Sequence, residues 1–368
     1  MLLLSLLITW VTASRGANTI ADLDRLQHDL SKFLSVPRYN ETEKQVTRNA
    51  IKIALEAVGL PSMTHTFIHE ETNEIGANVI AVQKSDLFGT SEDRIIVLTA
   101  NYDTLENSPG VDDNGSGVAA VIEAARILST LDSLYLRKYT ILYAFFDMKH
   151  KALAGSHAFV EDVLIPLLGR CNCSVTGAVV VDGMLHFDPF PASQAVPEGF
   201  EEDFPEAARL LHEHSHMGDF IQVTSRTHID DGVFQQYSMA YSMATEMLVS
   251  DWQFQPWLLP VKLHIRNASS INGLYKMHPY LFADHSSFFF HSQQDLDIPT
   301  IYVSDTLSRR GVRQYCPYCD GLYMMTAQNM KFLALLTDSL IRFLVASSQS
   351  EALAVVDELY TFVFNIDV

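Results

Sequence analysis

The chain has 368 residues, 48% of them hydrophobic, so it can bury the core of one large domain or of two smaller ones. Its 44 acidic residues outnumber 25 Lys and Arg residues, which gives a formal charge of -19. A surface this acidic repels phosphate backbones and anionic lipid, so no nucleic-acid partner is expected.

Residues 1–14 have the pattern of a secretory signal peptide. Leu2 to Val11 form an apolar stretch shorter than the roughly 20 residues that a membrane helix needs. Val11-Thr12-Ala13 resembles a small-residue cleavage site, although no Lys or Arg precedes the apolar stretch. A buried N-terminal helix is the alternative interpretation. The pattern predicts a secreted protein, and no later stretch is long enough to predict a membrane span.

Helical and extended patterns alternate along the chain. Apolar residues recur at helical spacing over residues 23–34, 46–58, 117–128 and 324–345. Continuous apolar runs cover residues 78–82, 95–100, 140–146, 178–181 and 300–303. Such runs are typical of strands that are buried on both faces. The alternation predicts an α/β fold, a three-layer sandwich whose mixed, largely parallel central sheet is flanked by helices.

Residues 186–280 break this alternation. They begin with loop-like proline and glycine segments, and the aromatic and methionine residues that follow form only short patterns. We therefore expect one domain over residues 15–350, with an insertion at about 186–280 that roofs a cleft, and a C-terminal tail over residues 351–368.

The four cysteines fall into two pairs, Cys171 with Cys173 and Cys316 with Cys319. In a secreted chain an even count predicts two disulfides, for which three connectivities exist. A four-thiolate zinc site is the alternative for the whole set, and a redox-active pair is the alternative for Cys316 and Cys319.

Because the chain is predicted to be secreted, its Asn-x-Ser/Thr sequences are candidate N-glycosylation sites. They occur at Asn40, Asn114, Asn172 and Asn267. Asn114 lies within a glycine-rich loop that we expect to be part of a metal site, so it is expected to be unmodified. The other three are predicted glycosylation sites.

Polar residues follow several of the predicted strands, where α/β folds gather their ligands. Asn101-Tyr102-Asp103, Asp147 and Asp182 each come directly after an apolar run or at its end, and a glycine-rich loop covers residues 110–117. The loop reads Gly-Val-Asp-Asp-Asn-Gly-Ser-Gly. Together with Phe-Asp and Leu-x-Gly-Ser within residues 146–156 and Asp-His at 284–285, these motifs resemble zinc exopeptidase family twenty-eight. That family includes secreted leucyl aminopeptidases, glutamate carboxypeptidases and glutaminyl cyclases, and the resemblance runs over roughly residues 20–345.

The resemblance implies a role for four residues that this chain retains. In active members two zinc ions share one carboxylate, whose position here is Asp113. The position of a further ligand carboxylate is Asp182, and that of a ligand histidine is His285. Asp103 matches the carboxylate that orients the first ligand histidine.

Three other positions depart from the family pattern. Asn101 stands where the family has its first ligand histidine. Lys149 stands where the general-base glutamate belongs, and His150 replaces the zinc-binding glutamate that follows. General-base loss alone lowers rates by ~10²–10⁴, so efficient peptidase turnover is not expected.

The altered set leaves two cofactor states open, one zinc ion or none. Asp113, His150 and His285 would suit one zinc ion with an open fourth position. The remaining donors, Asn101 with Asp113 and Asp182, are all oxygens and would suit Ca²⁺ or Mg²⁺ better.

Lys149 decides between these states. An ammonium ~4 Å from a dication costs several kcal/mol, so a pair of Lys149 with Asp113 and Asp182 in place of the second metal is the favoured arrangement. A solvated turn around Lys149 is the alternative.

The sequence therefore predicts a secreted, aminopeptidase-like member of a zinc metallopeptidase family whose catalysis is impaired or lost. It would keep a cleft for a peptide or amino-acid ligand. The alternative is a single-zinc exopeptidase or aminoacyl-transferring enzyme that acts on peptide termini, and a conventional two-zinc aminopeptidase is the third hypothesis.

Overall fold

The computed structural model describes residues 20–246, 254–265, 280–354 and 356. The predicted signal peptide, the predicted glycosylation site Asn267 and most of the predicted tail lie outside these residues. No helix among the described residues is both long and apolar enough to cross a membrane.

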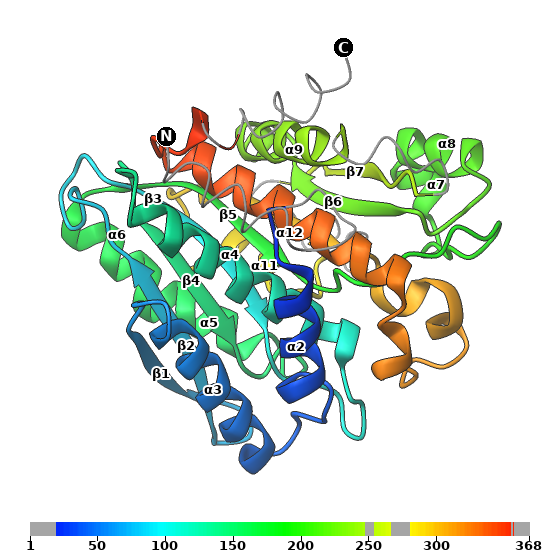
Figure 1. Cartoon of the computed structure of the whole chain (residues 1–368), viewed down its shortest axis with the longest axis horizontal. Coiled ribbons are helices and arrows are strands. Elements are labelled where there is room, and N and C mark those ends of the chain that lie inside the picture. Colours follow the sequence, from blue (N-terminus) through cyan, green and yellow to red (C-terminus); the bar gives the residue numbers. More distant parts are fainter. Residues whose placement is uncertain (1–19, 247–253, 266–279, 355, 357–368) are drawn as a thin grey trace, which may run out of the picture.

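An eight-stranded mixed sheet forms the centre of the molecule, with the strand order β1-β2-β4-β3-β5-β8-β6-β7 (Figure 1). The strands are β1 (Ser62–His69), β2 (Glu74–Gln83), β3 (Arg94–Asn101), β4 (Ile141–Phe146), β5 (Ser174–Val181), β6 (Phe220–Arg226), β7 (Trp257–Leu263) and β8 (Thr300–Ser304). Strands β4, β3, β5 and β8 run parallel, and β1, β2 and the β6–β7 pair join them through antiparallel contacts. The predicted α/β fold with a mixed sheet is confirmed.

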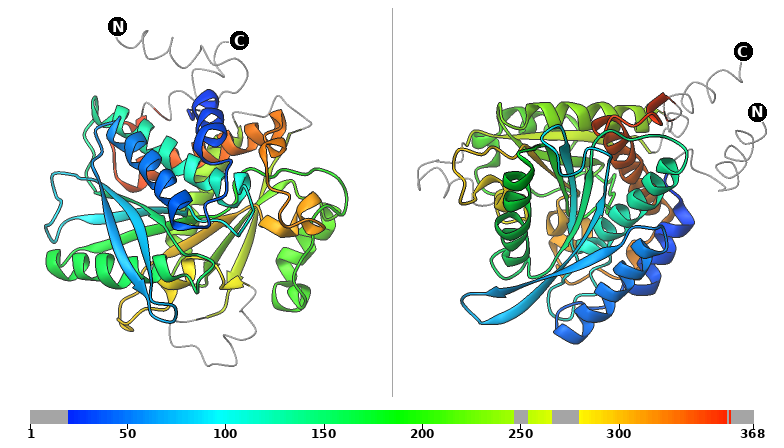
Figure 2. Two further views of the ribbon diagram at one scale, coloured as in Figure 1. Left: turned by 90° about the horizontal axis from the view of Figure 1, so that it is seen from below. Right: turned by 90° about the vertical axis from the view of Figure 1, so that its left-hand side faces the viewer.

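Helices cover both faces of the sheet, which is seen between them in the right-hand view of Figure 2. One face carries α2 (Leu23–Phe33), α3 (Glu41–Glu56), α4 (Gly117–Asp132), α9 (Asp231–Glu246) and α12 (Ala327–Ser347). The other carries α5 (Ala154–Phe159), α6 (Ile165–Cys171) and α11 (His285–Phe289). In β3, Ile96 and Leu98 pack toward the first layer and Ile95 and Val97 toward the second. Burial on both faces explains why this strand is continuously apolar.

Residues 186–280 contribute to the sandwich itself rather than only to a roof over a cleft. They contain β6, β7 and α9, and the short helices α7 (Phe200–Asp203) and α8 (Pro205–Glu213), which pack on β6 and β7. The sequence does not reveal β7 because it is an edge strand: it contains Pro260, and its burial alternates instead of running continuously.

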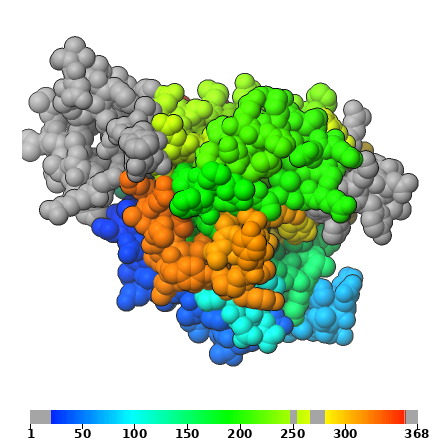
Figure 3. Space-filling model, turned by 90° about the vertical axis from the view of Figure 1, so that its right-hand side faces the viewer, coloured from blue at the N-terminus to red at the C-terminus, as the bar shows by residue number. Residues whose placement is uncertain are grey.

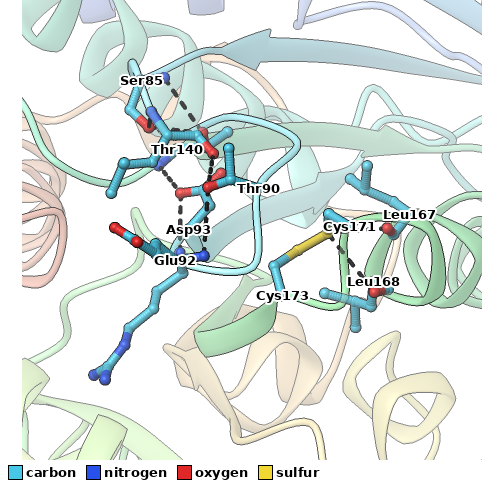
Figure 4. The surroundings of a disulfide bond; sticks show 11 residues. Ser85, Thr90, Glu92, Asp93, Thr140, Leu167, Leu168, Cys171 and Cys173 are labelled. Atoms are coloured by element: carbon cyan, nitrogen blue, oxygen red, sulfur yellow. Dashed lines mark hydrogen bonds between the residues drawn. A yellow bond between two sulfur atoms is a disulfide. The ribbon is translucent and has the colours of Figure 1, made fainter.

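The cysteines form two local disulfides, Cys171–Cys173 and Cys316–Cys319. Figure 4 shows the first, where the chain leaves α6. The prediction of two disulfides is confirmed, and the four-thiolate zinc alternative is wrong. The acceptors Asn40 and Asn172 are exposed, whereas Asn114 is buried, so glycosylation of Asn40 and Asn172 stays a prediction.

Candidate functional site

The carboxyl ends of β3 and β5 hold the turn over Val111–Ser116 between them. Asn114 donates from Nδ2 to Oδ1 of Asn101 and to the carbonyl of Val181, both at 2.9 Å. On the other side of the turn, the backbone N–H groups of Asp112 and Asp113 donate to the Asp320 carboxylate at 2.7 and 2.8 Å. These bonds fix the Asp113 carboxylate at the edge of the sheet, close to Asp182 at the end of β5.

Lys149 reaches both of these carboxylates. Its Nζ donates to Oδ1 of Asp182 at 2.6 Å and to Oδ1 of Asp113 at 3.3 Å. The side chain is buried, with the residue only 7% exposed, so the alternative of a solvated turn is wrong for Lys149. Burial by itself lowers the pKa of the Lys149 amine, but Asp113 and Asp182 raise it well above its ordinary value. The amine is therefore a fixed cation between two carboxylates.

A second cation, Arg313, takes the other oxygen of Asp113. Its Nη2 lies 3.3 Å from Oδ2 of Asp113, and its Nη1 donates to Oδ2 of Asp112 at 2.9 Å. Burial favours a raised pKa for Asp113, yet Lys149 and Arg313 together hold that pKa well below its usual range. Both carboxylate oxygens of Asp113 are thus engaged by cationic side chains of the chain itself.

Asn101 and Asp103 are part of the same buried network. Nδ2 of Asn101 lies 3.2 Å from the carbonyl of Asp103 and 3.5 Å from its Oδ1, and the backbone N–H of Lys149 donates to that oxygen at 3.2 Å. Asp103 therefore orients an asparagine amide and the start of the Lys149 turn.

Asp147, which follows β4, accepts a hydrogen bond from Nζ of Lys44 at 2.8 Å and so connects the sheet to α3.

His285 is separated from the carboxylates by an aromatic ring. Its ring stacks on Tyr302 with centroids 4.5 Å apart, and the Tyr302 hydroxyl donates to Oδ2 of Asp182 at 3.1 Å. Nε2 of His285 lies 2.9 Å from the carbonyl oxygen of Tyr280. His150 is exposed to solvent. Asp113, His150 and His285 are therefore not brought together as a metal-binding group.

The residues present do not fit the zinc ions that the family pattern implies. Across the described part of the chain, no group of three or more His, Cys, Asp or Glu side chains is arranged to hold a metal. The physical reason is the charge balance: Lys149 and Arg313 neutralise Asp113 and Asp182, and a dication placed among them would meet like charge. The predicted single-zinc set of Asp113, His150 and His285 is accordingly not formed.

Arg313, Tyr302 and Asp320 belong to this network but were not predicted from the sequence. Arg313 and Asp320 act on Asp112 and Asp113 across about two hundred residues. Figure 3 shows the segment that follows β8, in orange, at the surface between the green residues near 200 and the blue and cyan N-terminal part. The only sequence signal was the position of Tyr302 in an apolar run that ends at the same sheet edge.

Comparison with known proteins agrees with this architecture. Residues 78–239 match the model of peptidase family M28, so this part of the chain is similar to members of that family. Aminopeptidase YwaD of Bacillus subtilis (strain 168) is 32% identical over 90 residues, which are 24% of this chain and 18% of that protein. The probable lipoprotein aminopeptidase LpqL of Mycobacterium tuberculosis (strain ATCC 25618 / H37Rv) is 34% identical over 91 residues, which are 25% of this chain and 17% of that protein. The matches thus span less than a fifth of the length of these curated relatives.

Solved structures share the fold at low identity. The LapA aminopeptidase of Legionella pneumophila has a TM-score of 0.56 at 15% identity, over 89% of this chain and 72% of that chain. The glutaminyl cyclase of Porphyromonas gingivalis has a TM-score of 0.56 at 14% identity, over 89% of this chain and 99% of that chain. At such identities the likeness shows a common fold.

Proposed function

We propose that this protein is a secreted, aminopeptidase-like member of family M28 that has lost hydrolytic activity and binds an amino acid or a peptide. The observation that carries the proposal is the Lys149 amine, which lies 2.6 Å from Asp182 and 3.3 Å from Asp113. Secretion rests on the signal-peptide pattern of residues 1–14.

The loss of activity follows from the protonation state of Lys149. A general base must accept a proton near the working pH, but two carboxylates raise the pKa of Lys149 well above its ordinary value. The amine therefore stays protonated and cannot activate a water molecule. The neighbouring carboxylates are also poor general bases, because Asp113 forms ion pairs with both Lys149 and Arg313.

The single-zinc alternative has no support from the geometry. It needs His150 and His285 beside Asp113, yet His150 is exposed and the Tyr302 ring stacks against His285. The relatives named above as aminopeptidases support a ligand of the amino-acid or peptide class.

The test uses the full chain purified after secretion. We expect no bound zinc and no release of N-terminal residues from aminoacyl reporters, with or without added zinc. Stoichiometric zinc together with turnover that a chelator abolishes would overturn the proposal.

A matched variant restores the family pattern. The triple substitution Asn101→His, Lys149→Glu and His150→Glu is expected to take up zinc that the parent chain excludes. The control Lys151→Glu, on the same turn but in a partly exposed pair with Glu74, is expected to leave zinc uptake unchanged. If the triple variant behaves like the control, the assignment of family positions to these residues is wrong.

A further inference from the structure

A cavity of about 70 Å³ lies beside the Lys149 cluster, between the end of β8 and the segment that leads into α11. Its wall includes Tyr280, His285, Tyr302, Ser304 and Arg309. Because one buried water molecule needs roughly 10–15 Å³, the cavity can hold a small polar head group but not a whole peptide. Tyr302 connects it to the Lys149 cluster through its hydrogen bond to Asp182.

Arg309 brings a charge to this wall that no carboxylate of the described residues pairs with. Its guanidinium makes no ion pair or side-chain hydrogen bond within residues 20–246, 254–265 and 280–354, and its one aromatic contact is the Phe282 ring at 5.6 Å. Burial lowers the pKa of Arg309, so the uncompensated charge carries a desolvation cost. An anion in the cavity would offset that cost, and the forked guanidinium matches the two oxygens of a carboxylate.

His285 contributes a hydrogen-bond acceptor. A carbonyl oxygen can only accept, so the contact of Nε2 with the Tyr280 carbonyl places the ring proton on Nε2 and leaves Nδ1 with a free lone pair. Nδ1 is buried and has no partner among the described residues.

Tyr280, which also lines the cavity, carries a second polar group of this kind, its hydroxyl. It too is buried without a hydrogen-bond partner in the described part of the chain. Since about 90% or more of buried polar groups are satisfied in folded proteins, these two atoms require a partner, which a ligand or a water molecule in the cavity can supply.

We propose that this cavity binds the carboxylate end of an amino acid or of a peptide, with Arg309 on the carboxylate and Nδ1 of His285 accepting from the adjacent N–H of the ligand. The assignment rests on the proposed function, a cleft that binds amino acids or peptides without hydrolysing them. This arrangement selects the carboxyl terminus of the ligand. The Arg309 guanidinium attracts a carboxylate and repels an ammonium group, and Nδ1 of His285 needs an N–H group next to that carboxylate.

Isothermal titration calorimetry on the full chain tests this assignment with four probes. They are glycine, N-acetylglycine, N-acetylglycinamide and an N-acetylated tetrapeptide with a free C-terminus. The carboxylates are expected to bind, and N-acetylglycinamide is expected to bind at least about tenfold more weakly because it lacks the charge that pairs with Arg309. Tighter binding of glycine would identify a free amino acid as the ligand, and tighter binding of the tetrapeptide a peptide C-terminus.

Two variants sharpen the result. Arg309→Gln is expected to weaken carboxylate binding at least about tenfold. Arg209→Gln is the matched control, since Arg209 is exposed on α8 and, within the part of the chain that the structure describes, pairs with its neighbours Glu206 and Glu213. It is expected to bind the probes like the parent chain. Circular dichroism and thermal unfolding check that both variants fold, and the comparison of acid with amide on the parent chain does not depend on them.

Equal binding of acid and amide, unchanged binding by Arg309→Gln, or no binding of any probe at millimolar concentration would each overturn the inference. These outcomes differ from those that test the proposed function. Zinc and turnover together with Arg309-dependent binding would refute the proposed function and leave the inference standing. No zinc, no turnover and no carboxylate binding would refute the inference and leave the proposed loss of hydrolysis standing.

Discussion

The two sides of Asp182 differ in how their charges are compensated. On the β3 side, Lys149 and Arg313 pair with Asp113 and its neighbours, and each charged group there has a partner inside the chain. On the β8 side, within the described residues, Arg309 has no counter-ion and the His285 ring leaves Nδ1 unbonded. On the first side, the protein's own cations already occupy the carboxylates. On the second side, polar groups remain available to bind a ligand. Substitutions on the β3 side should therefore lower mainly the stability of the protein, and substitutions on the β8 side should weaken mainly ligand binding.

The largest effect on stability is expected from Lys149→Met. The change leaves Asp113 and Asp182 buried without their shared cation, which costs about 3–5 kcal/mol in the free energy of unfolding. Urea denaturation at neutral pH measures it. The control Lys151→Met removes a partly exposed pair with Glu74 and should change the free energy by less than about 1 kcal/mol. Equal effects for the two lysines would show that Lys149 is not the internal counter-ion.

Arginines on the two sides provide the next comparison. Arg313→Met removes the cation shared by Asp112, Asp113 and Asp320 and is expected to cost about 3 kcal/mol. Burial raises the pKa of Asp112 to about 7 and that of Asp320 to about 6, so these carboxyls take up protons more readily and the cost should be smaller at pH 6 than at pH 8. Arg309→Gln, by contrast, breaks no ion pair and is expected to change the unfolding free energy by less than about 1 kcal/mol. A larger loss for Arg309→Gln than for Arg313→Met would contradict the comparison.

A smaller effect is expected in acid, through His285. Burial lowers the pKa of this ring from 6.5 to about 3, so the unfolded chain takes up a proton at a higher pH than the folded chain. The stability contributed by the neutral ring is present above pH 6.5 and is lost as the pH falls toward about 3. His285→Phe keeps a ring against Tyr302 and removes this titration. The slope of stability against pH should therefore be shallower in the variant over that window, and an identical slope would rule out the neutral, buried ring.

The smallest effect is expected in alkali, through Lys149. Because the pKa of Lys149 in the folded chain lies above the ordinary 10.5, its contribution is fully present below that value and is lost only as the pH rises through the folded-state pKa. The difference in unfolding free energy between the parent chain and Lys149→Met should thus stay constant from pH 7 to about pH 9. A difference that already shrinks in that range would place the pKa of the amine too low for a fixed cation.

The sequence predicts the side of the molecule that local patterns encode. Continuous apolar runs mark β3 and β5, and the polar residues that end them lie where strands of a parallel sheet place them. Counting charges at the family's motif positions also predicts the pairing of Lys149 with Asp113 and Asp182, because a buried excess of carboxylate needs a cation.

The rest of the site depends on contacts that no local pattern records. Arg313 meets Asp112 across about two hundred residues, in a segment that has no motif of its own. Likewise, the orientation of the His285 ring follows from two contacts: its ring stacks on Tyr302, and its Nε2 bonds to the carbonyl of Tyr280. A histidine at a family ligand position therefore predicts a metal ligand only when the surrounding rings leave it facing the metal.

The central claim is that the Lys149 amine stands where a metal would otherwise be held, and zinc titration of the full chain tests it most directly. Equilibrium dialysis against zinc followed by elemental analysis should find no zinc bound to the parent chain, and zinc bound to the variant that carries Asn101→His, Lys149→Glu and His150→Glu. One or two zinc ions retained by the parent chain, and removed by a chelator, would contradict the account.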